Sequence, residues 1–144
     1  MAEITSNMPY DAITIGDTLP PWSRVTDIMH WNRYAAVNDE FLYFHMEDEA
    51  ARAALNPQGA FGMGNLRFAY MHNALEAVFG DVAAVRELSC QFRTINQKGD
   101  CLTVTGTVTE KWQDGAEQML RIKLDVRNQH GDSTCPGEAV IAYG

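Results

Sequence analysis

Hydrophobic and polar residues alternate along the second half of the chain, which is the pattern of strands with one buried face. The clearest case is the segment 120–127, where Leu, Ile and Val alternate with charged residues. The segment 101–112 alternates in the same way, with threonines on its polar side. Turn sequences at 98–100, 114–115 and 130–132 separate these segments. We therefore expect strands over 85–95, 101–112, 120–127 and 138–143, paired antiparallel in meander order.

The first half of the chain shows the spacing of helices. Asp27 can cap a helix that runs to about residue 38, whose apolar residues share one face. A short alanine-rich helix is expected over 47–55, where Asn56-Pro57 ends it. The segment 64–79 has apolar residues on almost every side, so we expect a helix that is buried nearly all round.

One long buried helix, four strands after it and a short strand near 22–25 indicate an α+β protein. This order fits an arrangement in which a curved antiparallel β-sheet wraps around the long central α-helix. The arrangement is called a hot-dog fold. The chain has 144 residues, the commonest size of one domain, and contains no internal repeat, linker or low-complexity tract. We expect a single domain over residues 1–144.

Composition and charge restrict the partners. Nineteen Asp and Glu against eleven Lys and Arg give a formal net charge of -8, which would repel the phosphates of a nucleic acid. No apolar run approaches the roughly 18 residues of a membrane span, and the start lacks the blocks of a signal peptide, so we expect no membrane partner and a cytoplasmic location. Cys90, Cys101 and Cys135 fit core or half-buried thiols better than a redox role.

The segment between the first two expected helices combines acidic residues with a histidine. Glu40 precedes His45 by five residues, with Asp39 beside it. No helical face brings residues at this spacing together, but an irregular loop can turn both toward one water molecule, which suits acid–base chemistry. In a simpler interpretation the two acids are the solvated end of a helix and His45 is a surface or capping residue.

Three glycines lie directly before the expected central helix, in the segment 59–65. The N–H groups of a first helical turn have no partner within the helix, and the helix dipole adds positive potential, so such a segment can receive a negative oxygen. The alternative is a tight loop that enters a crowded helix. The other histidines, at 30, 72 and 130, fit packing or surface positions, and we expect no metal site.

The order of these features resembles the MaoC-like acyl dehydratases, a family that includes the (R)-specific enoyl-CoA hydratases, from about Ile15 to Tyr143. The family's hydratase signature aligns without a gap with the segment 33–45 and places Glu40 on the signature aspartate and His45 on the signature histidine. Segments 61–63 and 98–109 are similar to its His-Gly-Met and Pro-Gly-Asp-x-Leu-Thr-x-x-Gly stretches. The chain departs from the family pattern at Asp39 (signature Gly), Leu42 (Asn), Tyr43 (Pro) and Phe61 (His).

The resemblance implies reversible hydration of a trans-2-enoyl-CoA to a 3-hydroxyacyl-CoA, with no cofactor beyond the coenzyme A of the substrate. Glu40 and His45 would activate the water, with Asp39 replacing Glu40 if the loop is shifted by one residue. The N–H of Gly62 would stabilise negative charge on the thioester oxygen. The resemblance further implies a homodimer or larger homo-oligomer, or a hetero-oligomer with a related hot-dog subunit.

Two other functions stay open at this point: a non-catalytic acyl-CoA-binding partner subunit, and a hot-dog acyl-CoA thioesterase. The basic residues considered for the coenzyme A phosphates are Arg67, Arg93 and Lys98. Aromatic residues near the predicted site fit either a bulky apolar acyl group or the protein core; these are Phe41, Tyr43, Phe44, Phe61 and Phe68.

Overall fold

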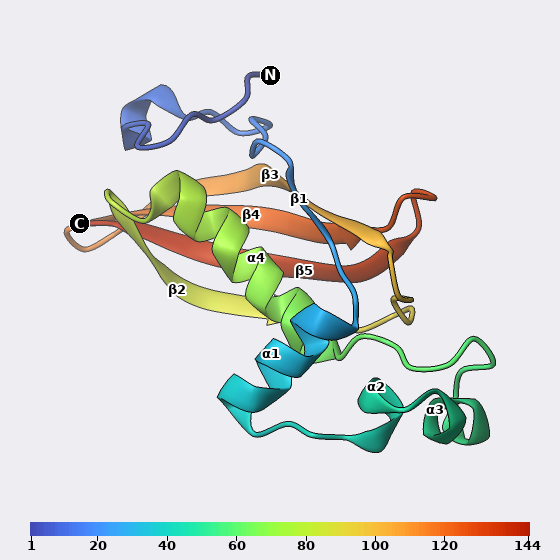
Figure 1. The fold of residues 1–144 in the computed structure, drawn as a ribbon. Helices are drawn as coiled ribbons and strands as arrows, with labels where there is room; N and C mark the ends of the chain where they lie inside the picture. The colour runs from blue at the N-terminus through green and yellow to red at the C-terminus, as the bar shows by residue number, and fades with distance from the viewer.

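Helix α4 (Gly64–Phe79) lies across one face of a five-stranded antiparallel sheet in the computed structural model, which describes all 144 residues (Figure 1). The strand order is β1-β3-β4-β5-β2. The strands are β1 (Trp22–Val25), β2 (Ala83–Cys90), β3 (Cys101–Asp114), β4 (Glu117–Arg127) and β5 (Ser133–Tyr143). The other helices are α1 (Ile28–Asn38), α2 (Tyr43–Met46), α3 (Asp48–Ala54) and a 3-10 turn (Tyr10–Ala12). This arrangement confirms the expected α+β hot-dog fold.

The core lies between α4 and the sheet. Alternate residues of β3 and β4 are buried, which gives the sheet one apolar face toward the helix. Helix α4 buries Tyr70, Ala74 and Leu75 within the same cluster of apolar side chains. The expectation that this helix is buried nearly all round is wrong, because only half of its residues are buried and one side, with His72 and Glu76, is exposed. The N-terminal segment adds Ile4, Ile13 and Leu19 to it. No helix of the chain has the length and apolar content needed to cross a membrane.

The expected meander is correct for three strands and wrong for the fourth. Strands β3, β4 and β5 are neighbours in sequence and in the sheet, but β2 pairs with β5 at the far edge and not with β3. Strand β2 also ends at Cys90, short of the expected residue 95, and β5 begins at Ser133, ahead of the expected residue 138. Alternation along a strand indicates which face is buried, but the partner strand depends on how the sheet closes around the helix.

The turn at 98–100, directly before β3, forms backbone hydrogen bonds with the residue that precedes the cap of α1. Gly99 has φ 81°, a conformation that favours glycine, and its N–H donates to the Thr26 carbonyl over 2.8 Å. The Thr26 N–H in turn donates to the Asp100 carbonyl over 3.0 Å. Asp27, which follows Thr26 in the chain, caps α1: its side chain accepts hydrogen bonds from two backbone N–H groups in the first turn of the helix. The start of α1 is therefore tied to the sheet.

Helix α1 is held against α4 by a buried tryptophan. Trp31 is fully buried, and its indole N–H donates to the hydroxyl oxygen of Thr26 over 3.0 Å. The Tyr70 hydroxyl of α4 lies 3.4 Å from the same Thr26 oxygen. A buried indole N–H needs such a partner, so this contact sets how α1 lies beside the central helix.

We expect Leu75→Ala to lower the free energy of unfolding by about 2–5 kcal/mol, because Leu75 is fully buried between α4 and the sheet and its truncation leaves a cavity. The matched control is His72→Ala on the exposed side of α4, which is expected to cost about 0.5 kcal/mol or less. Urea denaturation followed by circular dichroism measures both. Equal losses for the two variants would contradict the packing described above.

Candidate active site

Helix α1 ends in a backbone turn that orients the first acidic residues of the site. Asp39 has φ 53°, in the left-handed region, and the N–H groups of Asp39 and Glu40 both donate to the Ala35 carbonyl. Glycine suits this conformation best, and the family signature has glycine at this position. Asp39 therefore adopts the backbone conformation that a glycine at the aligned signature position would adopt most easily. The side chain of Asp39 is exposed and makes no hydrogen bond, so Asp39 lies outside the site.

Glu40 is held at the beginning of the central helix. Its carboxylate is half-buried and accepts a hydrogen bond from the Asn65 side-chain amide, whose Nδ2 lies 3.2 and 3.4 Å from the two carboxylate oxygens. Asn65 is the second residue of α4, so this contact places Glu40 beside the N-terminal turn of the helix. The sequence analysis did not identify Asn65 as a site residue, because its partner is distant in the sequence.

His45 lies on α2, a short helix that the sequence pattern did not predict. The side chain is 5% exposed, and its Nδ1 lies 2.7 Å from the Phe61 carbonyl oxygen. A carbonyl oxygen only accepts hydrogen bonds, so Nδ1 carries the proton and a neutral imidazole leaves the lone pair of Nε2 available. The rings of Phe44 and Phe61 pack edge-to-face with the imidazole, with centroids 4.7 and 4.9 Å away.

Burial keeps the imidazole of His45 neutral. Desolvation is the largest influence and lowers the pKa of His45 below its usual 6.5, while the hydrogen bond to Phe61 and the charge of Glu40 act in the opposite direction with smaller effect. At neutral pH the side chain is therefore a neutral base with an available nitrogen. The interpretation of His45 as a surface or capping residue is wrong, because the side chain is buried.

The segment that carries α2 and α3 is fastened to the loop before α4. Asp48 accepts a hydrogen bond from the Ala60 N–H at 2.9 Å and pairs with the Lys98 ammonium at 2.5 Å. The amides of Asn56 and Gln97 bond to each other in both directions, at 2.7 and 3.2 Å. These contacts hold the Phe61 carbonyl in place for His45.

Gly62 does not fit the expected role of oxyanion donor. Its N–H donates to the Asn96 carbonyl over 3.0 Å and is not free for a ligand. Glycine is needed there because an added Cβ would lie 2.1 Å from the side-chain nitrogen of Asn96. The N–H groups of Gly64 and Asn65 in the first turn of α4 have no acceptor within the protein. They are the donors that this helix offers to a negative oxygen.

Two of the three basic residues considered for coenzyme A are engaged within the protein. Arg67 is 4% exposed, and its guanidinium donates to the carbonyls of Thr94 and Thr134. Lys98 pairs with Asp48. Arg93 remains exposed, with a hydrogen bond to Gln91. Of the predicted catalytic residues, the structure thus brings Glu40 and His45 to the beginning of α4.

No protein-family model and no curated protein sequence matches the chain. Solved structures do match its fold. An R-hydratase, PhaJ1 from Pseudomonas aeruginosa, aligns with a TM-score of 0.86 and 23% identity over 96% of this chain and 87% of that one. A MaoC-like dehydratase from Rhodospirillum rubrum aligns with a TM-score of 0.82 and 19% identity, over 95% of this chain and 97% of that one. A chain of the ChsH1-ChsH2 complex from Mycobacterium tuberculosis aligns with a TM-score of 0.79 and 18% identity, over 91% of this chain and 98% of that one. The chain shares the hot-dog fold of these proteins.

In an NMR titration we expect His45 to titrate below 6.5, since burial disfavours its charged form. Glu40→Gln should lower the pKa of His45 further, because it removes a negative charge that favours the imidazolium. The control is Asp39→Asn, which removes the exposed carboxylate next to Glu40 and should change the pKa of His45 less than Glu40→Gln does. Because the folded-state pKa is depressed, stability should fall as the pH drops below 6.5, where the unfolded chain binds the proton more readily. A wild-type pKa above 6.5 would contradict the dominant effect of burial on this side chain.

We expect Asp39→Ala to be less stable than Asp39→Gly by about 1 kcal/mol, because the left-handed backbone at this position disfavours a Cβ. Both variants lose the same exposed carboxylate, so their difference reports the backbone alone. Chemical denaturation measures the free energy of unfolding of each. Equal stabilities would indicate that α1 ends in another conformation.

Proposed function

We propose that the chain hydrates the double bond of a trans-2-enoyl-CoA to give a 3-hydroxyacyl-CoA, in a reversible reaction. The observation that carries the proposal is a buried imidazole that donates through Nδ1 to the Phe61 carbonyl, keeps Nε2 free and lies within the electrostatic influence of the Glu40 carboxylate. A neutral base beside a carboxylate suits the activation of water. The shared fold with an R-hydratase and a MaoC-like dehydratase is consistent with this chemistry.

In the proposed reaction, the carboxylate of Glu40 and Nε2 of His45 hold one water molecule between them. The pair takes a proton from the water as its oxygen forms a bond to Cβ of the enoyl group. Electrons of the Cα=Cβ bond move toward the thioester oxygen, and Cα then takes the proton from the pair. The reverse sequence eliminates water, so the same residues serve hydration and dehydration.

The thioester oxygen becomes negative during this addition and needs hydrogen-bond donors. In our proposal these are the N–H groups of Gly64 and Asn65, which have no protein acceptor and lie at the positive end of the α4 dipole. The Asn65 side chain contacts Glu40, so the oxygen site and the water site are adjacent. The proposed reaction needs proton transfer and oxygen stabilisation only, so it includes no metal and no cofactor beyond the coenzyme A of the substrate.

We extend the proposal to the assembly: a homodimer or larger homo-oligomer, or a complex with a related hot-dog subunit. The second form is supported by the structural likeness to a complex of two named chains, ChsH1 and ChsH2. In such a complex the chain could act as a partner subunit, and the replacement of two signature residues by Leu42 and Tyr43 is consistent with that role.

We expect Glu40→Gln and His45→Ala each to lower the rate of enoyl-CoA hydration by about 100- to 10,000-fold, the usual contribution of a positioned acid–base group. The assay follows loss of the conjugated enoyl absorbance together with free-thiol release. The matched control is Asp39→Asn, which removes a neighbouring carboxylate that lies outside the site and should keep activity within about threefold of wild type.

Three results would contradict the proposal. Thiol release without hydration would identify a thioesterase. Full activity in both Glu40→Gln and His45→Ala would place the catalytic groups elsewhere. Tight acyl-CoA binding with no reaction of either kind would identify a non-catalytic subunit, and activity restored by a second chain would confirm that role.

A further inference from the structure

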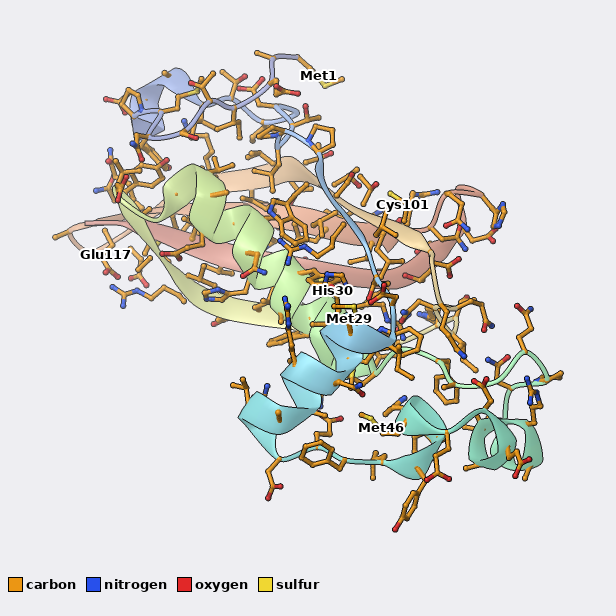
Figure 2. All side chains as sticks on the ribbon, viewed as in Figure 1. Met1, Met29, His30, Met46, Cys101 and Glu117 are labelled. Atoms are coloured by element: carbon orange, nitrogen blue, oxygen red, sulfur yellow. The ribbon has the colours of Figure 1, made fainter.

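A cavity of about 300 Å³ lies between α1 and α4, next to the candidate active site. One side is formed by residues of α1 spaced along a single helical face, and the other by Leu66, Ala69 and Tyr70 of α4. Figure 2 shows His30, which lines the cavity, on α1 where this helix approaches α4. Arg24, from the short strand β1, completes one end. The volume is at the lower end of the range for small-molecule sites, so it suits an acyl group rather than a whole coenzyme A thioester.

The cavity is lined by two arginines that lack an acidic partner. The chain contains eight arginines and has a net charge of -8. Four of these arginines form ion pairs with acidic side chains: Arg52, Arg86, Arg121 and Arg127. Arg24 and Arg33 form neither an ion pair nor a hydrogen bond, and both line this cavity. In a chain with an excess of acids, two unpaired guanidinium groups around one cavity point to a negatively charged ligand.

The guanidinium of Arg24 is held in position by aromatic rings. Its central carbon lies 5.0 Å from the Trp22 ring centre and 5.8 Å from that of Tyr70. Stacking of this kind orients the planar group and leaves its N–H donors free for a carboxylate. The nearest acid along the chain is Asp27, and its carboxylate already accepts hydrogen bonds from the first turn of α1 and contacts the His30 ring at 3.1 Å. It does not neutralise Arg24.

The cavity adjoins the residues proposed to act on the double bond, although Glu40 and His45 do not line it. Asn38, the last residue of α1, lines the cavity two residues before Glu40, and Tyr34 lines it one helical turn earlier. On the α4 side, Leu66 of the cavity directly follows Asn65, which contacts Glu40. A substrate with Cβ beside Glu40 would therefore extend the remainder of its acyl chain past Tyr34 toward the arginines.

We propose that the acyl group of the substrate ends in a carboxylate, which Arg33 and Arg24 bind in this cavity. The inference rests on the proposed hydratase function and names its substrate class. It differs from the expectation of a bulky apolar acyl group. The aromatic residues behind that expectation do not line the cavity: Phe44 and Phe61 pack on His45, and Phe41 and Tyr43 are exposed.

The position of the arginines limits the length of the acyl chain. Along α1, Arg33 lies about 7 Å and His30 about 12 Å from Asn38, at a rise of about 1.5 Å per residue. An extended chain advances about 1.2 Å per bond, so the carboxylate is expected roughly six to ten bonds beyond Cβ at most, and fewer if the arginine side chains reach inward. Because Cβ is the third carbon, this range corresponds to acyl groups of about nine to thirteen carbons at most.

The test compares trans-2-enoyl-CoA thioesters of equal length that end in a carboxylate or in a methyl group. We expect wild type to prefer the carboxylate series in kcat/KM. Arg33→Gln and Arg24→Gln should each lower kcat/KM for the carboxylate series by about 10- to 100-fold and change it less than about threefold for the methyl series, because a hydrogen bond to a charged group is lost only in the first. Arg33→Lys should recover part of the loss.

The control for the net charge is Arg52→Gln, an exposed arginine of α3 outside the cavity, which should affect both series equally. Calorimetric binding of the saturated acyl-CoA of each series separates this inference from the hydratase proposal. Selective binding of the carboxylate series without hydration would support the inference and reject the hydratase. Equal binding of both series by wild type would overturn the inference. Equal weakening of both series and of free coenzyme A by Arg33→Gln would overturn it too, because the arginines would then bind phosphate.

Discussion

Half of the residues of α4 are buried, and the rest of the chain must cover the broad apolar face that they form. The curved sheet covers one side, which explains why β2 crosses to the far edge and pairs with β5. The N-terminal segment covers another part with Ile4 and Ile13. Helix α1 covers a further part through the fully buried Trp31, while the side of α4 that carries His72 and Glu76 stays exposed. Because α1 follows the turn at the end of β1, the same requirement brings the end of α1, and with it Glu40, to the first turn of α4.

The chemistry of the site depends on a second buried group. Placing an imidazole in an apolar surrounding costs free energy unless its N–H finds an acceptor, and the Phe61 carbonyl provides that acceptor for His45. The bond fixes the tautomer, and burial keeps the ring neutral. The contacts of Asp48 with Ala60 and Lys98 hold the segment that carries His45 against the loop that carries Phe61. The position and the neutral state of His45 thus depend on contacts among three parts of the chain: the segment with α2 and α3, the loop before α4, and the turn that carries Lys98.

Charge in this protein is distributed unevenly, and the unevenness carries information on the ligand. An overall excess of acids favours pairing of every available arginine, and half of the arginines do pair. Arg24 stacks on aromatic rings while the neighbouring Asp27 is already engaged, and Arg33 forms no ion pair. In the proposed site, selectivity comes from the charge-assisted hydrogen bonds that a carboxylate forms with the two guanidinium groups and a neutral acyl tail does not.

Much of the fold follows from local patterns in the sequence. The bounds of α1 and α4, the short strand at 22–25 and the alternation along β3 and β4 all depend on spacing and on turn residues, which act between close neighbours in the chain. The resemblance to a known signature also singled out Glu40 and His45 as the predicted catalytic residues, a prediction that the proposed assays test. Other features depend on residues far apart in the sequence, and these were missed or misassigned: the pairing of β2 with β5, the contact of Asn65 with Glu40, and the bond between Gly62 and Asn96 that removes Gly62 as a donor. The sequence by itself determined the elements and the residue types of the site. Only the tertiary structure decided which groups are free to react, because the partner of each donor and acceptor is chosen when the chain closes around α4.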